Sequence, residues 1–593
     1  MNTEHAWRYI LVGAAISILP ILIVFRLISV QTNPQEVSTF NDQSKLYEGE
    51  YHTFYPARGQ IYDRWGNLLA GNKTVYQIGI ELQEVRNPQT IALTLNVVLG
   101  LDYTKVLGAA SMPPSKDAVF AVVADFVPPD KVEQLNQLAQ QIVDTYKGSQ
   151  DKNAPSLSGL KTVPHLMRSY PEKDVASNIL GFVSRDNKGY FGVEEKYNEL
   201  LAGKPKTVWM PLDPNRVSEL PNVPDGASLV LTLDRVIQAE MEKILDKAIQ
   251  SSGSKSGTIV VMDPKTGEIL ALATTPRIDL NDFSSYFDTF NSNTPFDRGV
   301  SQAYEPGSVY KVLTMATALD TGAVKPQTTF LDKGVFEIGG TLIYNWNGGA
   351  WGPQDMTGCL EHSLNVCLAW IATQTGAKNF YPYMQNFGIG HLSGVDLAGE
   401  VPGRLKIPGD ADWYDADLGT NAFGQGVSAT PLQMAAAISA VANNGKMMAP
   451  HIVRSMINKG YQYDMDQRVI AMPIKPETAR TLTEMLANSL EKESSDALVP
   501  GYRVAGKTGT AEIPTPMGYT SNMTNVSFVG WGPVDDESCC SNLGFLVYIW
   551  LEKPTTSIWG SEVASPVFSQ VVQRLVVLMN IPPDDVRHQL RGQ

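Results

Sequence analysis

Residues 306–311 read Pro-Gly-Ser-Val-Tyr-Lys, and the organisation of the larger part of the chain follows from this stretch. From Ser308 until Gly322 the apolar residues recur with helical spacing, at Val309, Val312, Leu313, Ala316 and Leu319. We therefore expect a helix with one buried face. Ser308 should lie at its start, with Lys311 one turn later on the same face.

This placement suits nucleophilic chemistry. An amine held close to the Ser308 hydroxyl, and partly removed from water, can lose its own proton and take that of the hydroxyl. The free backbone N–H groups of a helix N-terminus can also stabilise an oxyanion. The pattern alone is weak, because Ser-x-x-Lys recurs at Ser149, Ser158, Ser252 and Ser489. A serine N-cap followed by an incidental lysine is the alternative interpretation.

A second motif, Ser363-Leu364-Asn365, begins 55 residues after Ser308 and directly precedes another apolar helix. It is the one Ser-x-Asn in the sequence. A hydroxyl and an amide two residues apart point the same way from an extended or looped segment, so one can relay a proton while the other holds a substrate amide. An N-cap serine is again the alternative interpretation.

The third motif is Lys507-Thr508-Gly509-Thr510, at the end of the predicted strand Tyr502–Ala505. A strand that presents Lys and Thr outward, with Gly at the closest approach, can bind a carboxylate and lie alongside a peptide backbone. Similar triplets begin at Lys255 and Lys265, but both precede Ser308, and the second is the turn of a hairpin. The triplet at Lys507 is therefore the candidate.

The rest of this region predicts an α+β domain with one antiparallel sheet. Asp234 can cap a helix after the strand Ser228–Leu233, and a Pro- and Gly-containing turn joins the apolar runs Thr258–Asp263 and Glu268–Thr274. A mainly helical middle follows. Three further strands and a closing helix are expected at Tyr502–Ala505, Ser527–Trp531, Leu543–Leu551 and Ser561–Met579.

The N-terminus carries a long apolar segment. Residues 10–25 contain no charge, and the apolar run continues past Arg26 to the ~20 residues that cross a bilayer. We expect an uncleaved anchor. A cleaved signal peptide is the alternative, although no small-x-small cleavage site follows the run, which exceeds the usual ~7–15 residues. The distribution of basic residues predicts that the large C-terminal part lies outside the membrane. Arg8 precedes the span, and no Lys or Arg lies between Arg26 and Lys45.

Composition excludes several classes of protein. The 593 residues are 43% apolar, and 61 acidic against 47 basic residues give a net charge of −14, which argues against a nucleic-acid partner. The four cysteines show no spacing typical of zinc or dithiol centres. Cys359 and Cys367 invite a disulfide, but their spacing does not show that their β-carbons meet, and we expect buried free thiols. The adjacent Cys539 and Cys540 read as a turn before a strand.

Ser-x-x-Lys, Ser-x-Asn and Lys-Thr-Gly in this order are the signature of penicillin-interacting serine enzymes. The segments around them resemble the transpeptidase domains of high-molecular-mass penicillin-binding proteins, at Tyr304–Ser308, Phe423–Gly426, Thr430–Gln433, Ala442–Gly445, Lys507–Glu512 and Ala564–Phe568. In the N-terminal half, Arg58–Ala70, which reads as two short strands around a turn, resembles the pedestal of class B members, as do Arg168–Pro171 and Gly192–Glu194. Class B members carry no polymerase, and residues 32–225 show no glycosyltransferase signature.

The resemblance implies a particular architecture. A penicillin-binding/serine β-lactamase-like transpeptidase domain, with a five-stranded antiparallel sheet and helices, would stand on an elongated N-terminal pedestal behind a single transmembrane helix. The expected boundaries are a cytoplasmic tail 1–6, the anchor 7–31, the pedestal 32–225, the transpeptidase domain 226–580 and a C-terminal tail 581–593.

The resemblance also implies catalytic roles. Ser308 would attack the penultimate D-Ala carbonyl of a stem peptide and release the terminal D-Ala, and an amine of a neighbouring strand would resolve the acyl-enzyme. Lys311 would be the base toward Ser308. Ser363, helped by Lys507, would pass a proton to the leaving amine, while Asn365 holds the donor amide.

The third motif would bind the other end of the substrate. The hydroxyls of Thr508 and Thr510 would take the terminal carboxylate, with Gly509 between them allowing close approach. The backbone N–H groups of Ser308 and Thr510 would form the oxyanion hole. No metal or organic cofactor is required.

Ligands and partners follow from the same resemblance. We expect stem peptides ending in D-Ala-D-Ala and β-lactam antibiotics as ligands. A membrane glycosyltransferase of the shape, elongation, division and sporulation type is expected as partner, in contact with residues 10–220. The protein would lie in the bacterial cytoplasmic membrane as a single-pass protein with its catalytic domain outside.

Other functions stay open. A D,D-carboxypeptidase differs only in letting water resolve the acyl-enzyme. A serine β-lactamase shares the motifs but has no use for a span and a long pedestal. A non-catalytic β-lactam sensor or scaffold of the wall-synthesis complex is a further alternative. The sequence does not distinguish a role in elongation, division or sporulation, and it does not identify the acceptor amine.

Overall fold

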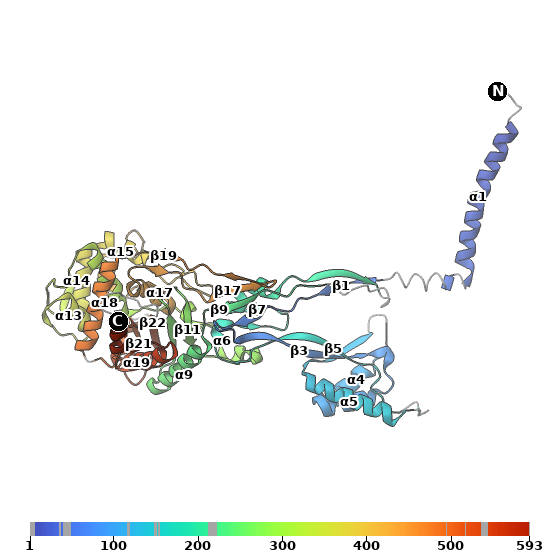
Figure 1. Ribbon diagram of the computed structural model, residues 1–593, viewed down its shortest axis with the longest axis horizontal. Coiled ribbons are helices and arrows are strands. Elements are labelled where there is room, and N and C mark those ends of the chain that lie inside the picture. Colours follow the sequence, from blue (N-terminus) through green and yellow to red (C-terminus); the bar gives the residue numbers. More distant parts are fainter. Residues whose placement is uncertain are drawn as a thin grey trace. The chain divides into compact units, whose positions relative to one another are not determined.

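The computed structural model describes residues 6–34, 37–38, 49–115, 119–147, 151, 154–211, 222–493, 495–515, 518–534 and 544–591 (Figure 1). The chain divides into two units. We call residues 1–57 with 203–226 the anchor unit, and residues 58–202 with 227–593 the main unit.

The anchor unit contains one long helix and one pair of strands. Helix α1 (Ala6–Thr32) includes the segment Trp7–Thr32, which contains an 18-residue window with a mean hydropathy of 2.5 and is long enough to cross a membrane. At ~1.5 Å per residue such a helix exceeds the ~30 Å of a bilayer core. Strands β1 (Gly49–Phe54) and β8 (Lys206–Pro211) pair antiparallel. The expected single apolar N-terminal helix is confirmed.

The N-terminal part of the main unit is built on a seven-stranded sheet. Its order is β18-β17-β9-β2-β3-β4, and β5 also pairs with β3. These strands are β2 (Ile61–Tyr62), β3 (Leu68–Glu81), β4 (Phe120–Val127), β5 (Leu160–Ser169), β9 (Ser228–Leu231), β17 (Val453–Asn458) and β18 (Tyr461–Asp464). Since β17 and β18 come from the C-terminal half, this sheet joins sequence regions that lie far apart.

A small helical core covers the outer part of β3. Ile78 and Ile80 of β3 are fully buried in it, together with apolar side chains of α3 (Pro88–Leu99), α4 (Tyr103–Ala110) and α5 (Pro129–Thr145). A buried ion cluster stabilises the end of β5. In it, Arg58 Nε and Arg168 Nε each donate to Glu194 at 2.7 Å. Removing one member of such a cluster would leave a buried charge uncompensated.

A second sheet forms the centre of the C-terminal part of the main unit, in the order β11-β10-β22-β21-β20. Every neighbouring pair is antiparallel, which confirms the expected five-stranded antiparallel sheet. Its strands are β10 (Ser256–Met262), β11 (Ile269–Thr274), β20 (Ala505–Thr515), β21 (Gly518–Gly532) and β22 (Phe545–Glu552).

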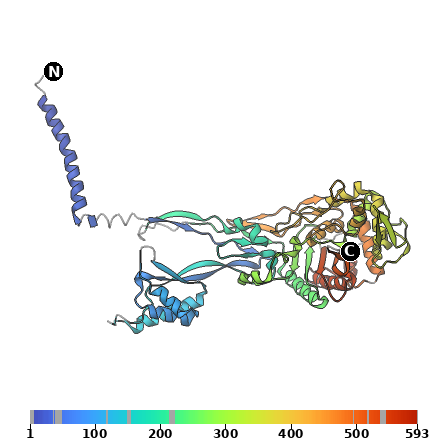
Figure 2. The same cartoon turned by 180° about the vertical axis from the view of Figure 1, so that it is seen from behind.

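Helices cover both faces of this sheet (Figure 2). Alternate residues of β10 point to opposite faces, so Ile259 and Val261 pack with α9 (Arg235–Ser252) and α19 (Gly560–Leu578). Val260 packs on the other side with α12 (Lys311–Thr321) and α17 (Pro431–Ala442). Asp234 caps α9 as expected, accepting from the backbone N–H of Val236 and Ile237.

The remaining elements surround these layers. Between α12 and α17 the chain forms β12 (Phe330–Asp332), β13 (Val335–Ile338), β14 (Thr341–Tyr344), β15 (Gly352–Gln354), α13 (Met356–Glu361), α14 (Asn365–Thr375), α15 (Ala377–Asn386) and α16 (Asp415–Asn421). Elsewhere lie η2 (Leu82–Glu84), α6 (Ser177–Leu180), β6 (Phe182–Val183), β7 (Gly189–Tyr190), α7 (Gly192–Lys196), α8 (Asn198–Ala202), η4 (Leu280–Ser285), α10 (Tyr286–Thr289), α11 (Arg298–Ser301), β16 (Met447–Met448), β19 (Val469–Ala471) and α18 (Pro476–Lys492).

One predicted strand is wrong. Tyr502–Ala505 was expected to be a strand ending before Lys507, but β20 begins at Ala505 and carries the third motif inside it. The preceding residues instead bind the C-terminal segment: the Tyr502 hydroxyl donates to Ile581 O, and the Arg503 N–H donates to Asp584. Pairing with β21 holds the polar residues of β20 in a strand that local propensity does not indicate. Residues Asp584–Arg591 form helix α20.

Candidate active site

Ser308 lies at the start of a helix, as expected. A 3₁₀ turn, η5 (Gly307–Tyr310), leads directly into α12, which ends at Gly322 with a positive φ of 75°. Ser308 lines a cavity of about 860 Å³, together with Ser363, Asn365, Thr508 and Thr510. Residues of all three motifs therefore meet at one cavity.

Lys311 lies beneath this cavity and is fully buried. Its Nζ lies 2.6 Å from the backbone oxygen of Ser363, 2.7 Å from Oδ1 of Asn365 and 3.2 Å from Oγ of Ser363. The first two are acceptors that orient the amine. The Ser363 hydroxyl can exchange a proton with it in either direction, depending on which group carries the proton.

Burial lowers the pKa of both lysines of the motifs. Burial, and secondly the charge of Lys507, lowers the pKa of Lys311 well below its usual value. Burial lowers the pKa of Lys507 to about 8, against the opposing effect of the nearby Glu493. A desolvated amine that is neutral near physiological pH can act as a base toward a hydroxyl.

The third motif lies on the edge of the central sheet. Strand β20 has one strand neighbour in this sheet, β21, so its other side is available to an extended peptide. Lys507 Nζ donates to Oγ1 of Thr508 at 3.2 Å, and the Gly560 N–H at the start of α19 donates to Oγ1 of Thr510 at 3.0 Å. The Thr510 hydroxyl is thus oriented by the backbone.

Two glycines allow the Ser308 turn to approach β20. A Cβ at Gly509 would lie 2.1 Å from Oγ of Ser527 and 2.9 Å from a methyl carbon of Val309. A Cβ at Gly307, where φ is +59°, would lie 2.6 Å from the carbonyl oxygen of Thr510. Any side chain at these two positions would push the nucleophile away from the strand.

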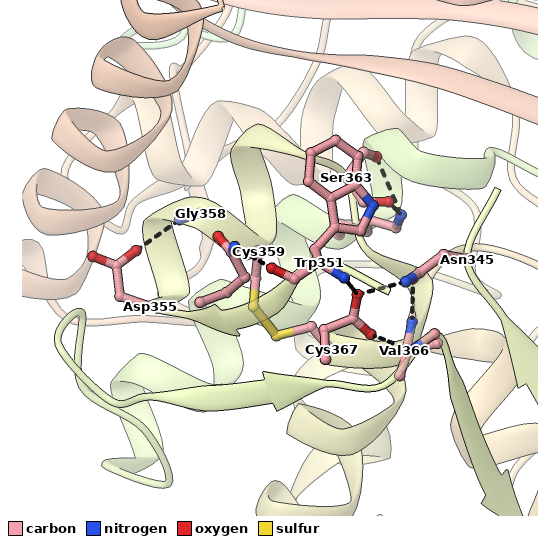
Figure 3. Close-up of a disulfide and its surroundings, with 12 residues drawn as sticks. Asn345, Trp351, Asp355, Gly358, Cys359, Ser363, Val366 and Cys367 are labelled. Carbon is pink, nitrogen blue, oxygen red and sulfur yellow. Dashed lines mark hydrogen bonds between the residues drawn. A yellow bond between two sulfur atoms is a disulfide. The ribbon is translucent and has the colours of Figure 1, made fainter. Parts of the chain in front are cut away.

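The prediction of free thiols at Cys359 and Cys367 is wrong, because the two form a disulfide (Figure 3). Ser363 lies between them with a positive φ of 51°, in the reversal that joins α13 to α14. This reversal brings the cysteine Cα atoms to 6.1 Å, within the range of a disulfide. The bond therefore closes the loop that carries Ser363, one of the two groups that contact Lys311. Cys539 and Cys540 lie outside the described residues.

The loop is also held by polar contacts, drawn in Figure 3. Asn345 Nδ2 donates to Asp332 at 2.8 Å, and Asn345 Oδ1 accepts from the Val366 N–H at 3.2 Å. Asp355 accepts from the Gly358 N–H at 2.7 Å and caps α13. The Val366 bond connects the C-terminal end of the loop to Asn345, and the Asp355 cap fixes the start of the helix that precedes the loop.

The competing motif matches have structural explanations. The hydroxyls of Ser252 and Ser489 are buried and donate to carbonyls four residues earlier in their own helices. Lys255 precedes the start of β10, and Lys265 lies in the turn between β10 and β11. Ser149 lies outside the described residues. None of the described competitors lines the cavity with Ser308.

Sequence reasoning missed several residues that line the same cavity. They include the aromatic residues Tyr344, Trp346, Trp351 and Trp559, and the titratable residues Glu361, His362, Glu493, Glu512 and Glu562. The rings of Trp346 and Trp559 meet edge to face at 5.2 Å. Only the position of His362, directly before the Ser363 motif, offered a signal in the sequence.

Comparison with known proteins agrees with this geometry. Residues 257–573, over half of the chain, match the family model of the penicillin binding protein transpeptidase domain, and residues 53–219 match that of the penicillin-binding protein dimerisation domain. Stage V sporulation protein D of Bacillus subtilis is 31% identical over 543 residues, covering 89% of this chain and 79% of the relative. The peptidoglycan D,D-transpeptidase FtsI of Escherichia coli is 26% identical over 599 residues, covering 98% and 94%.

Solved structures share the fold. Penicillin Binding Protein 2X of Streptococcus thermophilus superimposes with a TM-score of 0.72 at 22% identity, covering 89% of this chain and 80% of that chain. Penicillin binding protein 3 of Mycobacterium tuberculosis, complexed with aztreonam, gives 0.67 at 23% identity, covering 90% and 98%. With its transpeptidase and dimerisation domains, the chain belongs to the class B penicillin-binding proteins.

Proposed function

We propose that the chain is a peptidoglycan D,D-transpeptidase that works through an acyl-enzyme on Ser308. One observation carries this proposal: the buried Lys311 amine contacts both Ser363 and Asn365 beneath the cavity that Ser308 lines. The E. coli relative bears the name of this activity. Such an arrangement gives the Ser308 hydroxyl a base and gives that base a route for its proton.

In the first half-reaction Ser308 Oγ attacks the carbonyl carbon of the penultimate D-Ala and gives its proton to Lys311. The C–N bond breaks, and the terminal D-Ala leaves with a proton delivered through Ser363. Lys507 promotes this delivery, because its charge favours the neutral form of Lys311. Asn365 holds the donor amide.

The substrate carboxylate lies against β20 in this proposal. The hydroxyls of Thr508 and Thr510 bind it, and Gly509 permits the close approach. The N–H groups of Ser308 and Thr510 stabilise the oxyanion, and each donor of this kind is worth ~2.7–4 kcal/mol in a comparable hydrolase. In the second half-reaction an acceptor amine displaces Ser308 and forms the cross-link.

Product analysis tests the proposal against its main alternative. Incubation of the purified chain with a stem-peptide donor and an amine acceptor is expected to yield the new amide, separated by mass spectrometry. Hydrolysed donor alone would identify a D,D-carboxypeptidase. Neither product, from a preparation that still binds penicillin, would favour a sensor or scaffold.

We also propose the boundaries of five segments. They are a short N-terminal tail 1–6, the membrane anchor 7–31, the pedestal 32–225, the transpeptidase domain 226–580 and a C-terminal tail 581–593. The apolar α1 supports a membrane anchor. The catalytic part then lies outside the cytoplasmic membrane, beside a membrane glycosyltransferase of the shape, elongation, division and sporulation type that supplies the glycan strands and contacts residues 10–220.

This arrangement predicts two results. Protease added to intact spheroplasts should digest everything beyond about residue 32, the outer end of α1.

The glycosyltransferase should co-purify in mild detergent, and this association should be lost when residues 32–220 are replaced by a flexible linker. Protection of the catalytic part, or unchanged association of the linker variant, would contradict the arrangement.

A further inference from the structure

The second half-reaction requires a base that takes a proton from the acceptor amine, and the lysines of the three motifs do not line the cavity where that amine arrives. An alkylamine acceptor arrives protonated at neutral pH and must lose a proton before its nitrogen can attack. Lys311 is fully buried, Lys507 is 5% exposed, and neither lines the cavity. The base that meets the acceptor must therefore be sought among the groups that do line it.

His362 is the single imidazole among the described residues that line this cavity. Imidazole is the side chain suited to exchanging protons near neutral pH. The other titratable lining groups are carboxylates and two phenols, and one phenol, that of Tyr519, donates to Glu305. Burial, and secondly the charge of Glu305, raises the pKa of Tyr519, which makes it a poor exchanger of protons.

The imidazole of His362 has an aromatic neighbour on its face and an acidic neighbour near one nitrogen. Its ring stacks on Trp351, with centroids 4.1 Å apart and planes inclined by 17°. Its Nε2 lies 3.9 Å from Oε1 of Glu361. The stack fixes the plane of the ring, and the carboxylate lies on the side of a ring nitrogen. The backbone is fixed as well, because Trp346 Nε1 donates to the carbonyl oxygen of His362 at 3.1 Å.

The cavity also favours the approach of a cation. Four glutamates line it and none of its described lining residues is Lys or Arg, so its walls attract an ammonium. Glu361, the acidic neighbour of His362, is itself near Lys492 and Glu493 at the end of α18, and Glu493 is near the buried Lys507. Lys492 Nζ lies 3.6 Å from Glu361, on the oxygen that does not face the imidazole.

We infer that His362 is the base that takes the proton from the acceptor ammonium, and that Glu361 orients its imidazole as a positioning residue. This inference rests on the proposed function. The ammonium gives one proton to His362, and the free amine forms a bond to the acyl carbon. The bond from that carbon to Ser308 Oγ then breaks. Ser308 recovers the second amine proton through Ser363 and Lys311, and His362 returns its proton to water.

The test compares two acceptors that differ in protonation. A donor thioester acylates Ser308, and the acyl-enzyme is then treated with Nα-acetyl-lysine amide, whose side-chain amine is protonated at neutral pH, or with hydroxylamine, which is unprotonated there. His362→Gln is expected to slow transfer to the lysine amide ~10²–10⁴-fold, the usual contribution of a general base. Transfer to hydroxylamine should fall far less.

Equal slowing of both acceptors, or no slowing of either, would overturn the inference. Penicillin labelling of Ser308 in the same preparations checks the fold and the first half-reaction. Its failure in the unmodified chain would instead contradict the proposed function. His391→Gln is the matched control, because His391 is exposed and does not line the cavity.

Glu361→Gln supplies an independent test that does not depend on the folding of the His362 variant. Without the carboxylate the imidazole loses its charged neighbour, so transfer to the lysine amide should slow while transfer to hydroxylamine should fall far less. Glu477→Gln removes the same charge from α18, outside the cavity, and should leave both transfer rates unchanged. Unchanged transfer to the lysine amide in Glu361→Gln would exclude the pairing of Glu361 with His362.

Discussion

Ser308→Ala is expected to abolish covalent labelling by a fluorescent penicillin while the chain keeps its fold. In the proposed mechanism the β-lactam ring would present a strained amide in the position of the D-Ala-D-Ala amide, with its carboxylate toward Thr508 and Thr510. Acylation should therefore be fast in the unmodified chain. Without the Oγ the nucleophile that Lys311 would activate is gone.

The substitution is small enough to isolate this effect. Ser308 is partly exposed at the cavity, so removing its oxygen opens no buried space. Intact-mass spectrometry followed by peptide mapping gives the result. Label remaining on Ser308→Ala, or an adduct on Ser149, Ser158, Ser252 or Ser489, would contradict the assignment of the nucleophile.

The adduct on the unmodified chain should last many minutes. After acylation the leaving nitrogen stays tethered in the opened drug, so the path of the acceptor remains blocked. Neither Lys311 nor Lys507 lines the cavity where a hydrolytic water would stand. Retention of the label during a chase with unlabelled penicillin measures this lifetime.

The order of three short motifs predicted the fold and the family, although none of them is specific alone. Apolar periodicity correctly placed α12, the hairpin of β10 and β11, and α19, because buried faces dominate those segments. It failed at β20, where Lys507, Thr508 and Thr510 are polar. That strand exists because β21 pairs with it, and a tertiary contact of this kind leaves no local pattern.

The loop around Ser363 shows a second limit of the sequence. An eight-residue separation is compatible with many loop shapes, so it could not predict that Cys359 and Cys367 meet. The left-handed backbone at Ser363 decides this, and serine carries no strong signal for that conformation. The stacking of His362 on Trp351 is likewise invisible in the sequence, since the two residues come from different elements.

Lys311→Ala is expected to slow acylation of Ser308 by penicillin ~10⁴-fold or more, as when one member of a catalytic triad is removed. The substitution removes the amine that takes the Ser308 proton in the proposed mechanism. Lys507→Ala should cost less, because Lys507 acts on Lys311 through its charge rather than by contact with Ser308. Stopped-flow or quench labelling measures both rates. In Lys311→Ala the backbone oxygen of Ser363 and Oδ1 of Asn365 lose a hydrogen-bond donor. Near-ultraviolet circular dichroism therefore checks that this variant keeps its fold.

The pH dependence of acylation separates a base from a structural lysine. In the proposed mechanism the reactive form of Lys311 is the free amine, and its pKa lies well below the usual value because the side chain is buried. The acylation rate of the unmodified chain should therefore fall as the pH drops through that lowered pKa. In Lys311→Ala the residual rate should lose this acid limb. An acid limb that persists unchanged in Lys311→Ala would assign it to another group and remove Lys311 from the role of base.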